Sequence, residues 1–191
     1  MMTVMPNRYN RHDPQAEGLI TQVKERAENL YQTRQVLCTE AVVLTLNNAF
    51  NGGLSDTQAV SVSAPFSIAL GDSGCICGAL SGAVLACGLF TGNEQSRFHR
   101  RCMRESARQL HDEFKAANGA TCCRVLTRKV RHDRQAHFEQ CARLTGSAAE
   151  MAARLILHQR PELAGSADTG FLHKMDTRVG ALINRLVRKF A

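Results

Sequence analysis

Eight cysteines give this 191-residue chain its most distinctive chemistry. The opening sequence, MMTVMPNRYNRHDPQ, lacks the apolar segment of a secretory signal, so we expect a cytoplasmic protein whose thiols stay reduced. In that compartment cysteines serve as metal ligands, redox groups or small packed side chains. A chain of this length buries enough surface to fold without disulfides. The cysteines therefore predict metal or redox chemistry, with simple packing for some of them.

Cys77 precedes the most apolar segment, GALSGAVLACGLF. Small residues recur there every fourth position, as Gly78, Gly82 and Ala86, and would give a helix a groove for close approach. Each glycine costs a helix about 1 kcal/mol relative to alanine, so something must come close to these positions. A neighbouring helix and a bulky inorganic group are the two explanations. Backbone N–H groups and the helix dipole at this end would make Cys77 the most acidic thiol.

Helical periodicity runs through nearly the whole chain. We therefore predict an all-α, single-domain bundle of about six to seven helices over residues 14–191, after a flexible N-terminus of residues 1–13. The predicted helices cover about residues 14–30, 35–50, 78–90, 94–118, 136–158 and 170–190.

Residues 54–74, LSDTQAVSVSAPFSIALGDSG, have the least regular pattern. Alternating apolar residues around Val60 and Ile68 would suit a strand, but no second strand pattern exists to pair with it. We expect a short helix followed by an irregular loop. A further single turn of helix is predicted after Thr121.

The predicted C-terminal helix, residues 170–190, is amphipathic. Its apolar side would close the core or form the interface of a homodimer. That side comprises Leu172, Met175, Val179, Leu182, Ile183, Leu186 and Val187.

The net charge of +7 is concentrated in residues 97–134, which hold 11 Lys or Arg against 4 Asp or Glu. Helical spacing gathers Arg97, Arg100, Arg101, Arg104 and Arg108 on one face, which would attract anions. An acidic redox partner protein is the expected binder, and nucleic acid the less expected one. The longest apolar run is too short for a membrane span, and no phosphate loop, nucleotide fingerprint or Ser-His-Asp pattern is visible.

Four parts of the sequence resemble the C_GCAxxG_C_C family of redox-active proteins: LCTEAV around Cys38, CGALSGAVLACG from Cys77, CCRVL at Cys122 and Cys123, and Cys141. The resemblance spans about residues 30–145. It implies a small helical protein that holds a redox centre, thought to contain iron and sulfur, and that serves an oxidoreductase or transport system. The family is related to the iron-centre module of split-Soret cytochrome c. This chain lacks the Cys-x-x-Cys-His of covalent haem, so we expect no c-type haem.

The resemblance implies four metal ligands, one from each motif: Cys38, Cys77, Cys123 and Cys141. Cys122 stays open as an alternative to Cys123, because adjacent side chains point in opposite directions and only one would face the site. Gly78 and Gly82 would leave space for the cofactor.

Thiolate ligands suit iron–sulfur clusters and tetrahedral zinc. The four cysteines form no Cys-x2-Cys pairs, so we expect an iron–sulfur cluster rather than zinc. The predicted function is electron transfer at this centre. One alternative is a thiol–disulfide oxidoreductase that uses Cys77 with Cys38 or Cys123. The other is a non-enzymatic basic binding protein whose cysteines are structural.

We predict a separate role for each of three further cysteines and one histidine. Cys75 adds a Cys-x-Cys that the family pattern lacks and could alter the centre. Cys87 lies on an apolar helix and is expected to be a buried, inert thiol. Cys102 lies among arginines and is a possible reactive thiol. His137 shares a helix face with Cys141, so it is either a donor beside the centre or a surface histidine.

Overall fold

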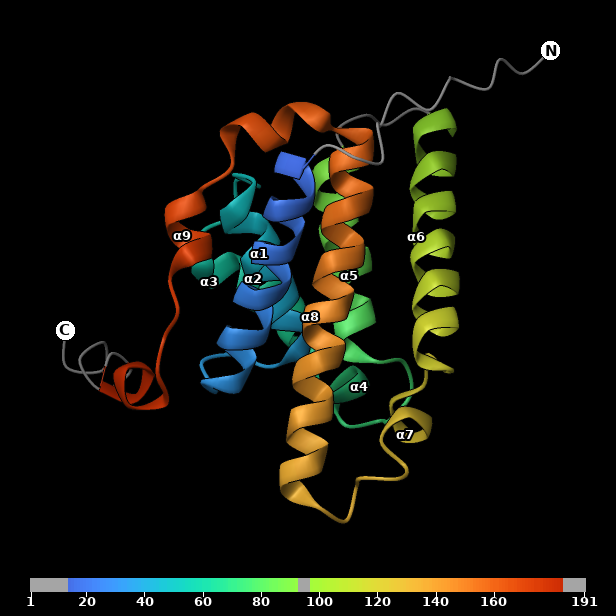
Figure 1. Ribbon diagram of the computed structural model, residues 1–191. Coiled ribbons are helices and arrows are strands. Elements are labelled where there is room, and N and C mark those ends of the chain that lie inside the picture. The colour runs from blue at the N-terminus through green and yellow to red at the C-terminus, as the bar shows by residue number, and fades with distance from the viewer. Residues whose placement is uncertain (1–13, 93–96, 184–191) are drawn as a thin grey trace.

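The computed structural model describes residues 14–92 and 97–183, which form helices joined by loops (Figure 1). The longer helices are α1 Pro14–Gln32, α2 Cys38–Ala49, α3 Asp56–Ser63, α5 Gly78–Thr91, α6 Arg97–Asn118 and α8 Arg134–Gln159. The shorter ones are η1 Ala64–Phe66, α4 Ser67–Gly71, α7 Cys123–Leu126, η2 Pro161–Ser166 and α9 Thr169–His173. Over the described ranges, the sole β pairing is an isolated bridge between Ile76 and Cys122. The predicted all-α fold is confirmed.

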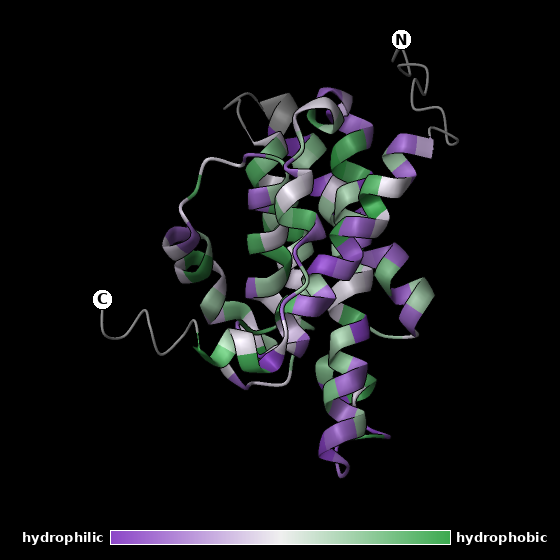
Figure 2. Cartoon of the chain, turned by 60° about the vertical axis from the view of Figure 1, so that its left-hand side comes forward, coloured by the Kyte–Doolittle hydropathy of each residue, from purple (hydrophilic) through white to green (hydrophobic). Residues whose placement is uncertain are grey.

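Helix α5 lies in the middle of the bundle, in contact with α2, α6 and α8, while α8 also packs along α1 (Figure 1). Small residues permit this close packing, because α8 presents four fully buried alanines to the core: Ala148, Ala149, Ala152 and Ala153. Larger side chains such as Phe50 and Phe90 fill the remaining space and meet edge to face with ring centroids 5.9 Å apart. Hydrophobic residues therefore concentrate in the central helices, as Figure 2 shows.

Helix α2 begins at Cys38, three residues later than its pattern predicts. Arg34 adopts a left-handed φ of 58°, and the N–H of Gln35 donates to the carbonyl of Leu30, which ends α1. The Glu40 carboxylate then accepts a hydrogen bond from the N–H of Leu37 at 2.9 Å and caps α2. Cys38 is thus the first residue of its helix.

Residues 54–74 contain a short helix followed by irregular backbone, as predicted, and no strand forms among them. Ser55 caps α3 by accepting from the N–H of Gln58 at 3.2 Å. The chain then makes a left-handed turn, with φ of 52° at Ile68, 54° at Ala69 and 63° at Leu70. Left-handed helical backbone costs roughly 1–2 kcal/mol per non-glycine residue, so contacts elsewhere must hold this turn.

The predicted continuous helix over residues 170–190 is wrong. Helix α9 ends at His173, residues 174–177 are not helical, and helix resumes at 178–183. Buried Arg26 donates to the carbonyl of Lys174 at 2.5 Å and to Asp176 at 2.9 Å, while Asn29 bonds both the N–H and the carbonyl of Asp176. These contacts tie the chain to α1 and interrupt the helix.

Most of the predicted apolar side of that helix faces solvent. Leu172 is buried, whereas Met175, Val179, Leu182 and Ile183 are exposed. Residues 184–190 lie outside the described residues, as does the predicted flexible N-terminus of residues 1–13. In the ranges 14–92 and 97–183, no helix combines the length and the hydropathy needed to cross a bilayer.

Candidate functional site

The four predicted cysteine ligands all line one cavity of about 410 Å³. Each comes from a different element: Cys38 begins α2, Cys77 precedes α5, Cys123 begins α7, and Cys141 lies in α8. No three His, Cys, Asp or Glu side chains in the described part of the chain form a group that could hold a single metal ion. The four thiols are nevertheless near enough for the charges of Cys38 and Cys123 to affect Cys77 and Cys141. Their role as ligands stays a prediction.

Cys77 is the residue that caps α5, as its sequence position predicts. Its side chain is only 5% exposed, and burial raises the pKa of its thiol to about 12. The backbone N–H groups of Leu80 and Ala79, at the start of α5, act in the opposite direction. Because burial outweighs the helix end, the expectation that Cys77 is the most acidic thiol is wrong.

Glycine at position 78 lets α2 and α5 meet at the cavity. A Cβ atom on Gly78 would lie 2.5 Å from Cys38 Sγ and 2.7 Å from Thr39 Oγ1. The Thr39 hydroxyl donates to the carbonyl of Gly78 at 2.9 Å. Gly78 therefore admits the neighbouring helix α2, which is one of the two explanations of the glycine pattern, and it also lines the cavity, where the inorganic group stays a prediction.

Gly82, one turn further along α5, is explained by the neighbouring helix alone. A Cβ atom there would lie 2.8 Å from the carbonyl oxygen of Thr39 and 2.9 Å from Val42 Cβ. The close approach at this position is that of helix α2. The structure thus places Gly82 against a helix, and its predicted contact with a cofactor gains no support from this packing.

The bridge between Ile76 and Cys122 brings α7 to the start of α5. The N–H of Cys77 donates to Thr121 at 2.8 Å, and the N–H of Cys123 donates to Cys75 at 2.9 Å. Cys123 lines the cavity, whereas Cys122 donates its thiol to the carbonyl of Gly74 at 3.3 Å. Of the two adjacent cysteines, the structure thus places Cys123 at the candidate site.

Tyr31 contacts Cys141 across the cavity, and the sequence analysis missed it. Burial raises the pKa of the Cys141 thiol to about 12, the nearby Cys123 and Cys38 act in the same direction, and the hydrogen bond with the Tyr31 hydroxyl lowers it. Burial, and the nearby thiols of Cys141 and Cys38, raise the pKa of Tyr31 above its ordinary range. No sequence motif marks Tyr31, because its contact with Cys141 depends on how α1 packs against α8.

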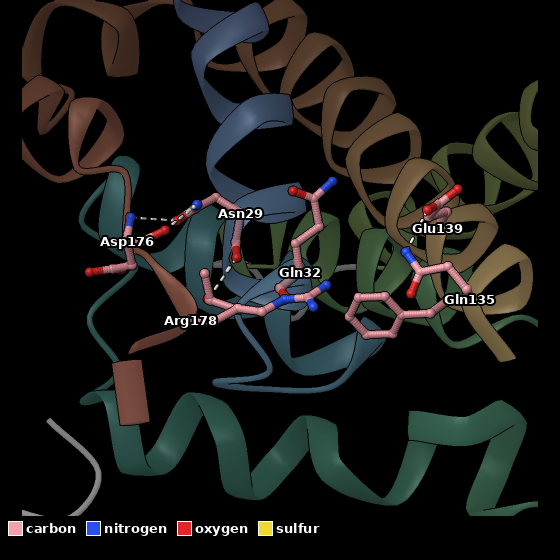
Figure 3. Close-up of a pocket in the computed structure, with 8 residues that line it drawn as sticks. Asn29, Gln32, Gln135, Glu139, Asp176 and Arg178 are labelled. Carbon is pink, nitrogen blue, oxygen red and sulfur yellow. Dashed lines mark hydrogen bonds between the residues drawn. The ribbon is translucent and has the colours of Figure 1, made fainter. Parts of the chain in front are cut away.

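A second pocket, of about 340 Å³, lies beside this one and is shown in Figure 3. Phe138 lines it and stacks on Tyr31 with ring centroids 5.1 Å apart. The guanidinium groups of Arg34 and Arg178 lie 5.1 and 5.5 Å from the centroid of the same ring. Tyr31 therefore borders the cysteine cavity on one side and the aromatic wall of the second pocket on the other.

Burial raises the pKa of the Cys123 thiol, and the neighbouring Cys38, Cys122 and Asp72 act in the same direction.

Other residues at the cavity differ in charge and polarity. Arg124, Asp72 and His137 line it together with apolar side chains. His137 is half-buried there, which agrees with the predicted position near Cys141.

The remaining cysteines lie away from this cavity wall. Cys75 is exposed, and Cys102 is half-buried on α6. Cys87 is 2% exposed and packs in the core, and burial raises the pKa of its thiol to about 12. The predicted buried position of Cys87 is confirmed.

Comparison with known proteins gives one match. Residues 36–155 match the family described as putative redox-active protein (C_GCAxxG_C_C). No curated protein and no solved structure matches the chain. The match includes all four cysteines that line the cavity and covers more than half of the chain. The chain belongs to the C_GCAxxG_C_C family of redox-active proteins.

Proposed function

We propose that the cavity holds an iron–sulfur centre ligated by the four cysteines and that this centre transfers electrons. The carrying observation is that four cysteines, remote from one another in sequence, line a single cavity: Cys38, Cys77, Cys123 and Cys141. A protein that used these thiols only for packing would have no reason to collect them around open space. When bound, the centre would supply one-electron redox chemistry.

The donor set and the cavity both support a cluster. Thiolate sulfur is a soft ligand that iron–sulfur clusters prefer, and a cavity of about 410 Å³ offers more room than one ion needs. Zinc is less well supported, because the four cysteines form no Cys-x2-Cys pairs.

This chain's own groups would tune such a centre. The backbone N–H groups of Leu80 and Ala79 lie beside Cys77 at the start of α5, and the Tyr31 hydroxyl lies beside the Cys141 sulfur. Hydrogen bonds to ligand sulfurs raise the potential of iron–sulfur centres by stabilising the more negative reduced form. Because the free thiols are protonated at neutral pH, binding of the metal would release protons.

The two alternative functions have weaker support. A thiol–disulfide oxidoreductase needs an accessible thiolate, whereas burial keeps the Cys77 thiol protonated and covered. For a basic binding protein, part of the arginine face of α6 is already neutralised, since Arg101 pairs with Glu105 at 2.8 Å and Arg108 with Asp112 at 3.8 Å.

The partner that we propose is an acidic redox protein that docks at the mouth of the cavity. Four of the exposed large apolar side chains lie on or beside the cavity lining: Leu37, Ile68, Leu70 and Val125. Residues 124–134 beside them hold five Lys or Arg against one Asp, and these charges are exposed. The lower end of the molecule in Figure 2, where α8 begins, is correspondingly hydrophilic. An apolar patch with a basic margin suits an acidic partner.

Anaerobic purification tests the centre directly. We expect a brown protein with iron and acid-labile sulfide in near-equal amounts, and we expect Cys77→Ala to lose both. Cys87→Ala is the matched control, because Cys87 is also buried, within the helix that Cys77 precedes, but does not line the cavity. Protein that binds only zinc, or iron binding that survives Cys77→Ala, would overturn the proposal.

A further inference from the structure

Cys75 has no place in the proposed ligand set, yet it lies next to one of its members. It is exposed, and its carbonyl accepts a hydrogen bond from the N–H of Cys123 at 2.9 Å. The isolated bridge pairs Ile76 with Cys122 in antiparallel register. One step outward from that bridge, Cys75 stands directly opposite Cys123.

The register also fixes which residues share a face. Side chains alternate along extended backbone, so Cys75 and Cys77 belong to one face and Ile76 to the other. Cys123 begins α7, but the extended backbone of Cys122 before it carries the pairing up to Cys123, which places Cys123 opposite Cys75 and on the face of Cys77. Cys77 and Cys123 both line the cavity, which agrees with this assignment. Cys75 therefore stands at the exposed margin of the same face.

The spacing of such a pair suits a disulfide. One backbone hydrogen bond joins Cys75 and Cys123, and opposite residues of antiparallel strands have Cα atoms about 4.5–5.5 Å apart. Disulfides join residues whose Cα atoms are roughly 4.4–6.8 Å apart, so little backbone movement is needed. The pairing here is a single bridge rather than a sheet, which leaves the backbone free to adjust.

We propose that Cys75 and Cys123 form a reversible disulfide when a peroxide oxidises the protein. Cys75, the exposed partner, attacks hydrogen peroxide, breaks its O–O bond and becomes a sulfenic acid while one water leaves. The Cys123 sulfur then attacks the Cys75 sulfur and forms the S–S bond, and the hydroxyl leaves with the Cys123 proton as a second water. Two thiols lose two electrons and two protons in total, and the peroxide is reduced to water.

This disulfide would remove Cys123 from the cavity and so prevent a four-cysteine centre from assembling. That consequence rests on the proposed function, whereas the disulfide itself does not. Cys75 would act as a redox sensor whose oxidation keeps the protein free of metal until a thiol reductant restores both sulfurs.

Peptide mapping of metal-free protein tests the link. Reduced, chelator-treated protein is exposed to one equivalent of hydrogen peroxide, free thiols are alkylated, and the linked peptides are sequenced by fragmentation. We expect a mass loss of two hydrogens and a Cys75–Cys123 link as the main product. Cys75→Ser should abolish it, whereas Cys122→Ser, which alters the adjacent thiol, should leave its yield unchanged.

The same oxidation of iron-loaded protein gives a second readout. In that protein Cys123 would be a ligand of the iron–sulfur centre, so we expect about tenfold less of the Cys75–Cys123 disulfide. A dominant link between any other two cysteines, or a Cys75 sulfinic acid without a link, would overturn the proposal. Because the metal-free measurement requires no centre, failure of the iron–sulfur function leaves this test intact.

Discussion

Gly78 leaves its side-chain space to the sulfur of Cys38. A Cβ atom on Gly78 would lie 2.5 Å from Cys38 Sγ, closer than such atoms approach in proteins. Gly78, the first residue of α5, therefore leaves room for the side chain of Cys38, the first residue of α2. Both residues line the cysteine cavity. The position of the Cys38 sulfur depends on the absence of a side chain at residue 78.

Gly78→Ala should therefore disturb the candidate centre. The new methyl group must displace Cys38 or Thr39, and such overpacking typically costs about 1–3 kcal/mol of unfolding free energy. We expect iron bound per chain to fall well below the wild-type value, as measured by metal analysis alongside urea unfolding.

Gly88→Ala is the control within the same helix. The nearest atom to a Cβ there is Met103 Cε at 4.0 Å, so the methyl group meets open space. Replacing glycine with alanine in a helix should stabilise this variant by about 0.5–1 kcal/mol and leave its iron unchanged. Equal iron content in the two variants would show that Gly78 does not position Cys38 for the centre.

Buried thiols should make the metal-free protein less stable in alkali. Burial raises the pKa of Cys77 and of Cys87 from an ordinary value of 9.0 to about 12. Above pH 9 the unfolded chain loses these protons while the folded chain keeps them, so unfolding is favoured as pH rises. Each group should lower the unfolding free energy by up to about 1.4 kcal/mol per pH unit between pH 9 and 12.

Urea unfolding of reduced, metal-free protein at several pH values above 9 measures this slope. Cys87→Ala removes one titrating group without touching the cavity, so its stability should fall less steeply with pH than that of wild type. Parallel curves would mean that the Cys87 thiol titrates normally in the folded protein.

Tyr31→Phe should make the proposed centre harder to reduce. The substitution removes the hydroxyl that hydrogen-bonds the Cys141 sulfur but keeps the ring that stacks on Phe138. Without this hydrogen bond the more negative, reduced form is less stabilised. We expect the midpoint potential to fall by about 60 mV, the equivalent of a tenfold change in a one-electron equilibrium. Redox titration measures it, and Phe138→Leu, which retains the hydroxyl, should shift the potential much less.

Helical periodicity predicted the main helices because their buried residues recur on one face, as in α1 and α8. The left-handed turn at Ile68, Ala69 and Leu70 had no such signal, since non-glycine residues rarely adopt that backbone. The break after His173 depends on Asp176, which bonds α1 residues nearly 150 positions away. Local patterns carry no information about such distant contacts.

The candidate site was likewise predicted from the sequence only in part. Cysteine order and the family resemblance identified four residues that prove to share a cavity. Tyr31 was missed because only the packing of α1 on α8 brings it to Cys141. The acidity of Cys77 was misjudged because the helix end is a local feature, whereas burial depends on the whole fold.

Reversing charge at the mouth of the cavity should weaken association with an acidic redox partner. Arg128 and Lys129 are exposed between α7 and α8, beside the apolar residues that flank the cavity. Opposite charges accelerate encounter between proteins, so Arg128→Glu/Lys129→Glu should lower the association rate constant for a plant-type ferredoxin, used as an acidic probe, by about tenfold at low salt. Stopped-flow measurements at two salt concentrations would show the wild-type rate falling steeply with salt and the variant's rate changing little.

The matched control reverses two charges elsewhere on the basic surface. Arg104→Glu/Arg108→Glu on α6 changes the net charge by the same amount but lies on the face that the sequence alone would favour for anions. If docking occurs at the cavity mouth, this control should retain most of the wild-type rate, because encounter depends on the charge nearest the contact. An equal loss in both variants would instead assign the attraction to net charge, and a larger loss in the α6 variant would move the docking surface to that helix.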